Sequence, residues 1–426
     1  MQRFVLPLTL LLGALPCSAQ ISTELFGMAA NAGVVATWHP EPWPAVSHRG
    51  VRLWDTTTVW RDLNPSDGTY DFSTLDRWLQ GAYEHDQDVV YTFGVVPPWA
   101  SSDPTDPICD DGVGTCDPPK DVNPDGSGTD QMWKNFVTAL VTHNKNSSTA
   151  RIQYWEMWNE PHNNFYWNGT YAQLVRMIGD AYQIIKAADP NAVVLSPTLG
   201  MGWSYYLNWA SGYLAAGGYK YVDIVSTHAY LMAYGKYHPP EVMPTELPAY
   251  RQMLAKFGLD KKPLWDLEAN WGGGRLNDPD LQAAWLSRYY ILHVANSLSR
   301  FYWYSYNGGD LGGLWIPDPH DQTKPGTILK PGIAYQQMYE WLPGATMPNG
   351  CQTSGTVWTC GLTRSGGYQG LLVWDTSQTC SNGFCGTTQY TYQGGYIQYR
   401  DLDGNTWQIT GKTVGIGAKP ILPENE

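Results

Sequence analysis

The clearest sign of the fold is the stretch Ile152-Gln153-Tyr154-Trp155-Glu156-Met157-Trp158-Asn159-Glu160-Pro161. It begins as a short apolar and aromatic run, which is typical of a buried strand, and Pro161 cannot continue the hydrogen bonds of a strand. Residues 171–188 follow with apolar positions at helical spacing. A strand followed by such a helix is the repeating unit of a parallel sheet.

The same order recurs along the chain. Strand-like runs begin near Phe26, Val51, Asp88, Ile152, Ala192, Tyr221, Pro263 and Arg300. Helical patterns cover residues 75–85, 131–143, 171–188, 248–257 and 281–297. Eight such units predict an α/β fold, the (β/α)8 TIM barrel. An open doubly wound sheet is the alternative, but residues 27–31 lack the Gly-rich phosphate turn that usually follows its first strand.

The chain changes character after about Pro343. Gly, Thr, Tyr and Gln dominate there, helical periodicity ends, and short alternating runs appear at 356–362, 370–375 and 396–401. Such runs are typical of a small β-sandwich. The 426 residues are therefore predicted to form a catalytic barrel over 20–343 and a β-sandwich accessory domain over 344–426.

Composition narrows the possible partners. The chain is 43% hydrophobic and 15% charged, so it has ample material for a packed core. Its formal net charge of -13 and the lack of a Lys/Arg cluster argue against nucleic acid and anionic membranes as partners. The 21 Trp and 28 Tyr outnumber 9 Phe, and both types join a flat apolar face to a polar tip. This bias predicts a surface that stacks on flat, polar molecules.

The first 19 residues predict export. Arg3 is followed by an apolar run over 4–15 and by Cys17-Ser18-Ala19, the order of a cleaved secretory signal. A lipoprotein site at Cys17 is the alternative, but Leu15 and Pro16 are poor neighbours for one. The run is too short to span a bilayer. We expect a secreted monomer, extracellular or periplasmic, with no membrane contact after signal removal.

The six remaining cysteines form close couples, which predicts disulfides in an exported protein. The couples are Cys109 with Cys116, Cys351 with Cys360, and Cys380 with Cys385. A metal site is the alternative, but no Cys-x-x-Cys occurs and no His lies at ligand spacing. The first couple lies in the Pro-, Asp- and Gly-rich segment 97–129, which is predicted to be either a lid over the site or a surface insertion.

Two glutamates are placed for chemistry. Glu160 stands at the carboxyl end of the fourth predicted strand, and Glu268 stands near that of the seventh, before the glycines at 272 and 273. These strands lie across the barrel from each other, at the end where barrel enzymes carry their active sites. Paired carboxylates can cut a glycosidic bond, one as proton donor and the other as nucleophile or base. Asp266 is a rival to Glu268, and two ordinary loop acids are the plainer interpretation.

These residues resemble a known group of enzymes. The run Trp158-Asn159-Glu160-Pro161 resembles the Asn-Glu-Pro signature of glycoside hydrolase clan A, whose members are (β/α)8 barrels. The run from Tyr154, residues 94–100 and the trailing sandwich are most similar to family 39, with family 5 as a near relative. The resemblance covers about residues 24–343 in layout. It implies that Glu160 is the general acid/base and Glu268 the nucleophile, although Leu267 stands where many relatives have Thr.

The resemblance also implies roles for polar neighbours. Asn159 resembles the clan's Asn that binds the sugar 2-hydroxyl, and Arg52 resembles the Arg that keeps the nucleophile ionised. Arg52 is otherwise expected to pair with Glu156 inside the barrel, where Glu156 has a structural role. His228 and Tyr230 match the clan's His-x-Tyr after the sixth strand, or they are satisfied polar groups of the core.

Three tryptophans are predicted to stack on sugar. Trp303 resembles the aromatic floor of the cleaving subsite, and Trp99 and Trp271 are expected with it at the rim. The alternative is that these large side chains only fill the core.

The sequence thus predicts a secreted, retaining glycoside hydrolase that cleaves β-glycosidic bonds of a neutral polysaccharide or oligosaccharide, such as a xylan, glucan or mannan. No metal or organic cofactor is expected. One rival is a non-catalytic carbohydrate-binding barrel, which would need the aromatic residues but not Glu268. Another is a metal-dependent barrel hydrolase, for which His228 alone near a strand end supplies too few ligands.

Overall fold

The computed structural model describes residues 19–37, 40–233, 236–272, 276–318 and 324–426. Apart from Ala19, the predicted signal peptide lies outside these residues. Within them, each helix is either too short or too polar to cross a membrane.

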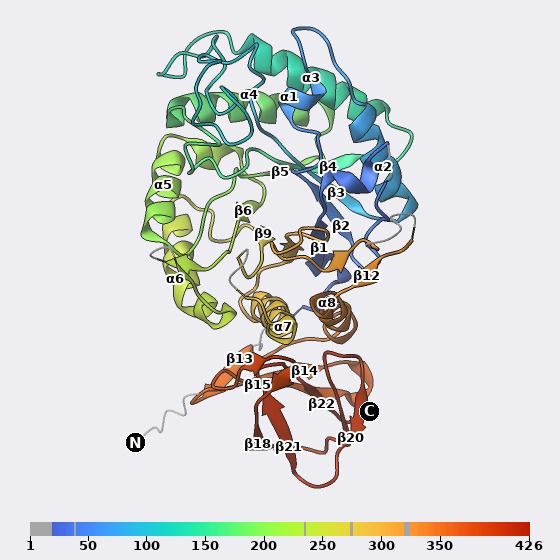
Figure 1. Ribbon diagram of the computed structural model, residues 1–426. Coiled ribbons are helices and arrows are strands. Elements are labelled where there is room, and N and C mark those ends of the chain that lie inside the picture. Colours follow the sequence, from blue (N-terminus) through green and yellow to red (C-terminus); the bar gives the residue numbers. More distant parts are fainter. Residues whose placement is uncertain (1–18, 38–39, 234–235, 273–275, 319–323) are drawn as a thin grey trace, which may run out of the picture.

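Eight parallel strands form the predicted barrel (Figure 1). In spatial order they are β5 (Val193–Leu195), β4 (Ile152–Glu156), β3 (Asp88–Thr92), β2 (Gly50–Leu53), β1 (Phe26–Ala29), β10 (Arg300–Trp303), β9 (Leu264–Ala269) and β6 (Val225–Thr227). A parallel bridge between Leu195 and Ile224 joins the two ends of this sheet. The barrel is therefore closed, and the prediction of a TIM barrel is confirmed.

Helices surround the strands. They are α1 (Trp60–Leu63), α2 (Ser73–Glu84), α3 (Gln131–Asn146), α4 (Tyr171–Ala188), α5 (Ser204–Ala215), α6 (Met243–Ala255), α7 (Pro279–Ala295) and α8 (Lys330–Trp341). Helix α4 begins where Thr170 and Gln173 form a capping box, and Asp278 caps α7 through two backbone amides.

The sequence patterns missed some of these elements. Helices α5 and α8 were not predicted; Pro331 and Gly332 at the start of α8 usually mark loops, but Pro is tolerated in a first turn. Helix α6 holds Pro248 inside it, whereas the predicted helix began there. The sixth strand begins at Val225 and not near Tyr221, which ends a 3-10 helix.

A smaller β-domain follows the barrel. Its main sheet has the order β13 (Cys351–Ser354), β14 (Val357–Thr363), β15 (Gln369–Asp375), β22 (Leu422–Glu424), β19 (Gln398–Arg400) and β20 (Thr406–Gln408). Two further antiparallel pairs belong to this domain, β18 (Thr387–Thr391) with β21 (Thr413–Gly417) and β16 (Cys380–Ser381) with β17 (Phe384–Cys385). The three predicted disulfides are confirmed. The predicted division of the chain at 343/344 stays a prediction.

The β-domain packs against α7 and α8, below the barrel in Figure 1. Arg288 of α7 is buried and donates to the carbonyl of Ala418 with its Nε at 2.9 Å. Asp280, also on α7, binds Lys419 at 3.0 Å and Lys330 at 2.6 Å. The two domains thus share one polar and apolar boundary centred on helix α7.

Candidate active site

The two predicted catalytic glutamates meet in one cavity at the carboxyl ends of the strands. Glu160 follows β4 with a backbone φ of 38°, an uncommon conformation that is concentrated at functional sites. Glu268 lies in β9, and one oxygen from each carboxylate lies within 4.8 Å of the other. The cavity has a volume of about 340 Å³ and is lined by Glu160, His162, Asn163, Phe165, Gly200, Met201, Tyr206, His228, Tyr230, Leu231, Glu268 and Leu311.

A bulge in β9 explains why Glu268 faces this cavity and Asp266 does not. Phe301 pairs with Asp266, but Trp303 pairs with Ala269, so the register shifts between them. Such a shift re-aims a side chain. Asp266 is fully buried on the side of helix α7, where it contacts His293 Nε2 at 2.8 Å. The rival carboxylate is therefore outside the cavity.

Arg52 joins the predicted polar residues into one network. Its guanidinium is buried and donates to Glu156 at 2.9 Å, to Glu268 at 2.6 Å and to Asn159 at 2.7 Å. Arg52 therefore makes the contacts that both interpretations require, one with Glu156 inside the barrel and the others with Glu268 and Asn159. The planar fork of guanidinium donors suits this task, which a lysine could not perform.

Glu156 supports Arg52 from below. Besides Arg52, its carboxylate accepts hydrogen bonds from Thr92 at 2.8 Å, Ser226 at 2.7 Å and Thr198 at 3.0 Å. Burial raises the pKa of Glu156, but the charge of Arg52 and these hydrogen bonds outweigh burial and bring it to about 2. Glu156 therefore stays ionised and fixes the guanidinium.

Glu268 is held by two donors, Arg52 and the Tyr230 hydroxyl at 2.8 Å. Burial raises its pKa; His228 and Arg52 act against this rise, and the neighbouring Glu160 adds to it. The net direction is upward, so Glu268 is the more basic carboxylate of the pair in this arrangement.

Glu160 forms a close ion pair with His228, whose Nδ1 lies 2.9 Å from its Oε1. Asn163 donates to the other oxygen at 2.9 Å. Burial raises the pKa of Glu160, but the hydrogen bond and charge of His228 outweigh it and bring the pKa to about 2. Burial lowers the pKa of His228, but the surrounding carboxylates raise it to about 9.

The tautomer of His228 follows from its second nitrogen. Thr198 donates its hydroxyl hydrogen to the ionised Glu156, so its oxygen accepts from His228 Nε2 at 3.2 Å. Nε2 therefore carries a hydrogen in either charge state. The exchangeable proton lies between Nδ1 of His228 and the Glu160 carboxylate, so these two residues form one proton-holding pair.

None of the three predicted tryptophans lines this cavity; burial corrects the expectation of sugar stacking for Trp303 and Trp271, and for Trp99 it stays a prediction. Trp303 is 0% and Trp271 is 1% exposed, and their rings pack 5.3 Å apart. In β10, Arg300 and Tyr302 face the barrel interior, so Trp303 faces outward against Tyr289 of α7. Trp99 is half-buried and donates to the carbonyl of Asn64.

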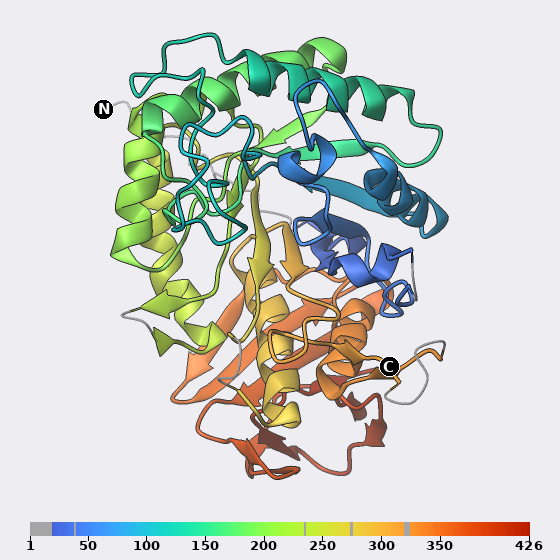
Figure 2. The ribbon, with the colours of Figure 1, turned by 45° about the horizontal axis from the view of Figure 1, so that its top comes forward.

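Other aromatic residues line the cavity instead of these tryptophans. Phe165, Tyr206 and Tyr230 line the cavity, together with His162. Phe165 lies in the connection after β4, and the disulfide-pinned segment 97–129 packs against it, with Asp110 N bonded to the Phe165 carbonyl at 3.2 Å. Figure 2 shows this segment in blue-green over the rim of the barrel. The sequence signal for them was the position of His162 directly after Pro161 and of Phe165 four residues after it.

Among the described residues, two groups of side chains have the spacing of metal ligands. Glu160, His228 and Glu268 each offer one atom within 4.8 Å of the others. Arg52 and His228 already pair with these two carboxylates. Asp106, Cys109, Cys116 and Asp117 form the other group, but its two cysteines are joined in a disulfide and cannot act as thiolate ligands.

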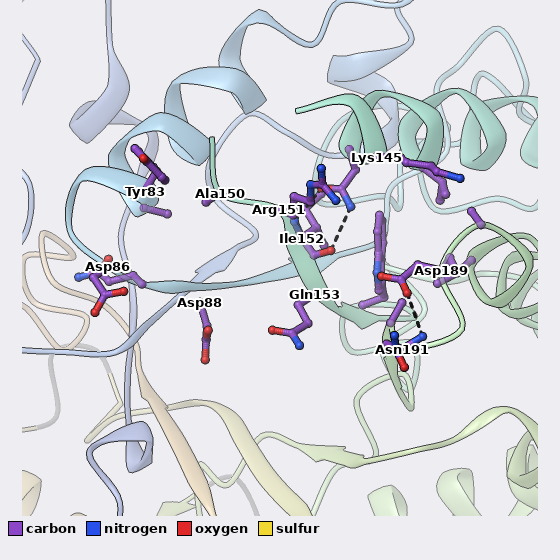
Figure 3. Close-up of a pocket in the computed structure, with 18 residues that line it drawn as sticks. Tyr83, Asp86, Asp88, Lys145, Ala150, Arg151, Ile152, Gln153, Asp189 and Asn191 are labelled. Carbon is purple, nitrogen blue, oxygen red and sulfur yellow. Dashed lines mark hydrogen bonds between the residues drawn. The ribbon is translucent and has the colours of Figure 1, made fainter. Parts of the chain in front are cut away.

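A larger cavity of about 640 Å³ lies at the opposite end of the barrel (Figure 3). Asp88, Ile152 and Gln153 line it at the amino ends of β3 and β4, facing Lys145 and Asp189. Barrel enzymes carry their chemistry at the carboxyl ends of the strands. We therefore assign the reaction to the smaller cavity.

Comparisons with known proteins agree with this fold. Residues 28–197 match the family model of the glycoside hydrolase 123 catalytic domain. A family 39 glycoside hydrolase from the gut symbiont Bacteroides cellulosilyticus WH2 is 16% identical, with a TM-score of 0.67 over 95% of this chain and 82% of that chain. A monomeric beta-xylosidase from Caulobacter crescentus CB15 is 14% identical, with a TM-score of 0.65 over 96% and 97%. A family 30 endoxylanase from Clostridium papyrosolvens C71 is 14% identical, with a TM-score of 0.58 over 96% and 97%.

These findings define the class of protein. The chain has the fold of the clan A glycoside hydrolases, as the Asn-Glu-Pro run suggested, and family 39 enzymes are among its structural neighbours. Together with the matched catalytic-domain model, this makes the protein a glycoside hydrolase.

Proposed function

We propose that the protein is a retaining glycoside hydrolase, with Glu268 as nucleophile and Glu160 as acid/base. The observation that carries the proposal is the distance of at most 4.8 Å between one oxygen of each carboxylate. Retaining enzymes hold their carboxyl groups about 5 to 5.5 Å apart, whereas inverting enzymes leave about 6.5 to 9.5 Å for a water molecule. This spacing favours covalent displacement.

The reaction then proceeds in two steps. Glu268 attacks the anomeric carbon while Glu160 gives a proton to the leaving oxygen, and a glycosyl ester forms on Glu268. Glu160 then takes a proton from water, whose oxygen displaces Glu268 from the anomeric carbon. Attack requires Glu268 ionised and Glu160 protonated, the reverse of the resting preference of the pair. When a substrate oxygen separates Glu160 from His228, Glu160 loses the hydrogen bond and charge that lower its pKa; the proton of His228 Nδ1 then moves to the Glu160 carboxylate and leaves His228 neutral.

The cavity favours a neutral substrate. Among its described lining residues there is no Lys or Arg to meet a sugar carboxylate, and its acids are engaged by Arg52 and His228. A β-linked backbone is proposed from the similarity to a beta-xylosidase. The three disulfides support a place of action outside the cytoplasm.

Glu160→Gln tests the proton-donor role. We expect a loss of roughly 10²- to 10⁴-fold in kcat/KM on a glycan, because the leaving sugar oxygen needs a proton. An aryl glycoside with a strongly acidic phenol needs none, so its glycosylation rate should change little. Pre-steady-state kinetics on both substrates measures this difference. Equal losses on the two substrates would remove Glu160 from the role.

His228→Asn tests the shared proton. We expect kcat/KM to fall on the order of 10²-fold at neutral pH, with the basic limb of its pH profile moving to lower pH. The sign follows from the raised pKa of His228, about 9, below which the pair keeps its proton. Without His228 the proton must remain on Glu160 alone, which loses it at lower pH.

His162→Asn is the matched control for this profile. His162 lines the same cavity, but burial lowers its pKa to about 4, so it is neutral in the working range. Its replacement should leave the basic limb in place. An unchanged limb in His228→Asn would show that the proton is held elsewhere.

A further inference from the structure

The cavity extends from the carboxylates toward one side of the barrel. Apart from Glu268 and Leu311, its described lining residues belong to the chain segments after β4, β5 and β6. Glu160 stands on this side as well. Because the proton donor faces the departing oxygen, this side receives the leaving group.

Aromatic side chains continue from the cavity to the surface there. Tyr206 lines the cavity, and its ring lies 4.4 Å from that of His162. Trp203 contacts Tyr206 edge-on at 5.5 Å, and Tyr205 lies 5.5 Å from Trp203. Tyr205 is 47% exposed. Tyr205 also lies 5.8 Å from Tyr206, so the three rings all contact one another at the start of helix α5, and we term them the α5 aromatic cluster.

The position of the α5 aromatic cluster is fixed by neighbouring residues. A Cβ on Gly200 would lie 2.9 Å from the Tyr206 ring, so only glycine lets the ring lie this close to the β5 connection. The Tyr205 hydroxyl donates to the carbonyl of His162 at 2.7 Å, two residues after Glu160. This hydrogen bond joins the α5 aromatic cluster to the segment that carries the proposed acid/base, Glu160.

We propose that the α5 aromatic cluster of Tyr206, Trp203 and Tyr205 binds the sugar chain on the leaving-group side of the cleaved bond. Flat aromatic faces with polar tips suit the apolar faces and hydroxyl rims of sugar rings. The substrate is then a chain that continues beyond the cleaved bond on the leaving-group side. This inference rests on the proposed function.

The test compares two substrates in Tyr205→Ala and Trp203→Ala, whose side chains lie outside the lining of the cavity. On a long neutral β-glycan oligosaccharide that the wild type cleaves, we expect kcat/KM to fall at least tenfold. On an aryl glycoside, which places no sugar on this side, we expect a change within about twofold. Trp203 is partly exposed, so its replacement provides the variant that keeps the fold.

Trp407→Ala is the matched control, since its indole is 49% exposed on β20 of the C-terminal domain. It should leave both substrates unchanged. With an active wild type, three results would overturn binding by the α5 aromatic cluster. They are an equal loss of kcat/KM in Trp407→Ala, an equal loss on both substrates, or no loss in either cluster variant. If the wild type were inactive on every glycan and aryl glycoside, this would instead overturn the proposed function, on which the role of the α5 aromatic cluster depends.

Discussion

Glu268→Ala should lower kcat by on the order of 10⁴- to 10⁶-fold, as removal of a covalent nucleophile does in other hydrolases. The remaining carboxylate can still protonate a leaving group, but the anomeric carbon has no partner within reach. Azide should restore turnover of an activated aryl glycoside, because the small anion fits the space that the carboxylate vacates. The product should be a glycosyl azide of inverted anomeric configuration, which proton NMR identifies.

Glu268→Gln is the matched control for this rescue. Its amide fills the space of the carboxylate, so it should be equally inactive and should not respond to azide. A Glu268→Ala protein that keeps its activity would exclude Glu268 as nucleophile and favour a substrate-assisted route. The binding-only barrel would be favoured instead if the wild type itself bound glycans and cleaved none.

Glu156→Gln should lower the free energy of unfolding by about 3 to 5 kcal/mol at neutral pH, because it leaves the buried Arg52 charge without its main partner. The carboxylate contributes this stability in its ionised form. Its pKa falls from 4.5 to about 2 on folding, so the contribution is complete above pH 4.5 and is lost as the pH falls toward 2. Urea unfolding at several pH values measures the difference between wild type and variant.

Asp86→Asn serves as the control. It also removes a carboxylate from an arginine, Arg49, at 2.7 Å, but the Asp86 side chain is 89% exposed. Exposed pairs of this kind contribute little. A loss in Glu156→Gln no larger than in Asp86→Asn would mean that the Arg52 network does not stabilise the fold.

Much of the barrel could be predicted from local patterns. Short apolar runs bounded by Pro or Gly mark strand ends, and strand ends in a parallel barrel meet at one place. Glu160 and Glu268 were found for this reason. The disulfides were also predictable, since two cysteines only 5 to 9 residues apart are held close together by the chain itself and pair with each other.

The aromatic residues of the site were not predictable in this way. Trp303 and Trp271 resemble rim residues in sequence, but the alternation of β10 turns Trp303 toward α7, and only the paired strands reveal that alternation. Tyr206 belongs to a helix with few polar positions, which hides helical periodicity. Its place beside His162 depends on contacts between the segment after β4, which holds His162, and the segment after β5, which leads into α5.

Helix α7 has a wider consequence for how this enzyme could be shortened or recombined. On one side its His293 holds Asp266, directly behind the catalytic strand, and on the other its buried Arg288 ends on Ala418. Deleting everything after the barrel would remove the carbonyl that this guanidinium binds, leave it only Glu241 among the described residues, and destabilise the helix that supports the strand of Glu268. The C-terminal portion is thus an integral wall of the catalytic unit, unsuited to exchange as an interchangeable module.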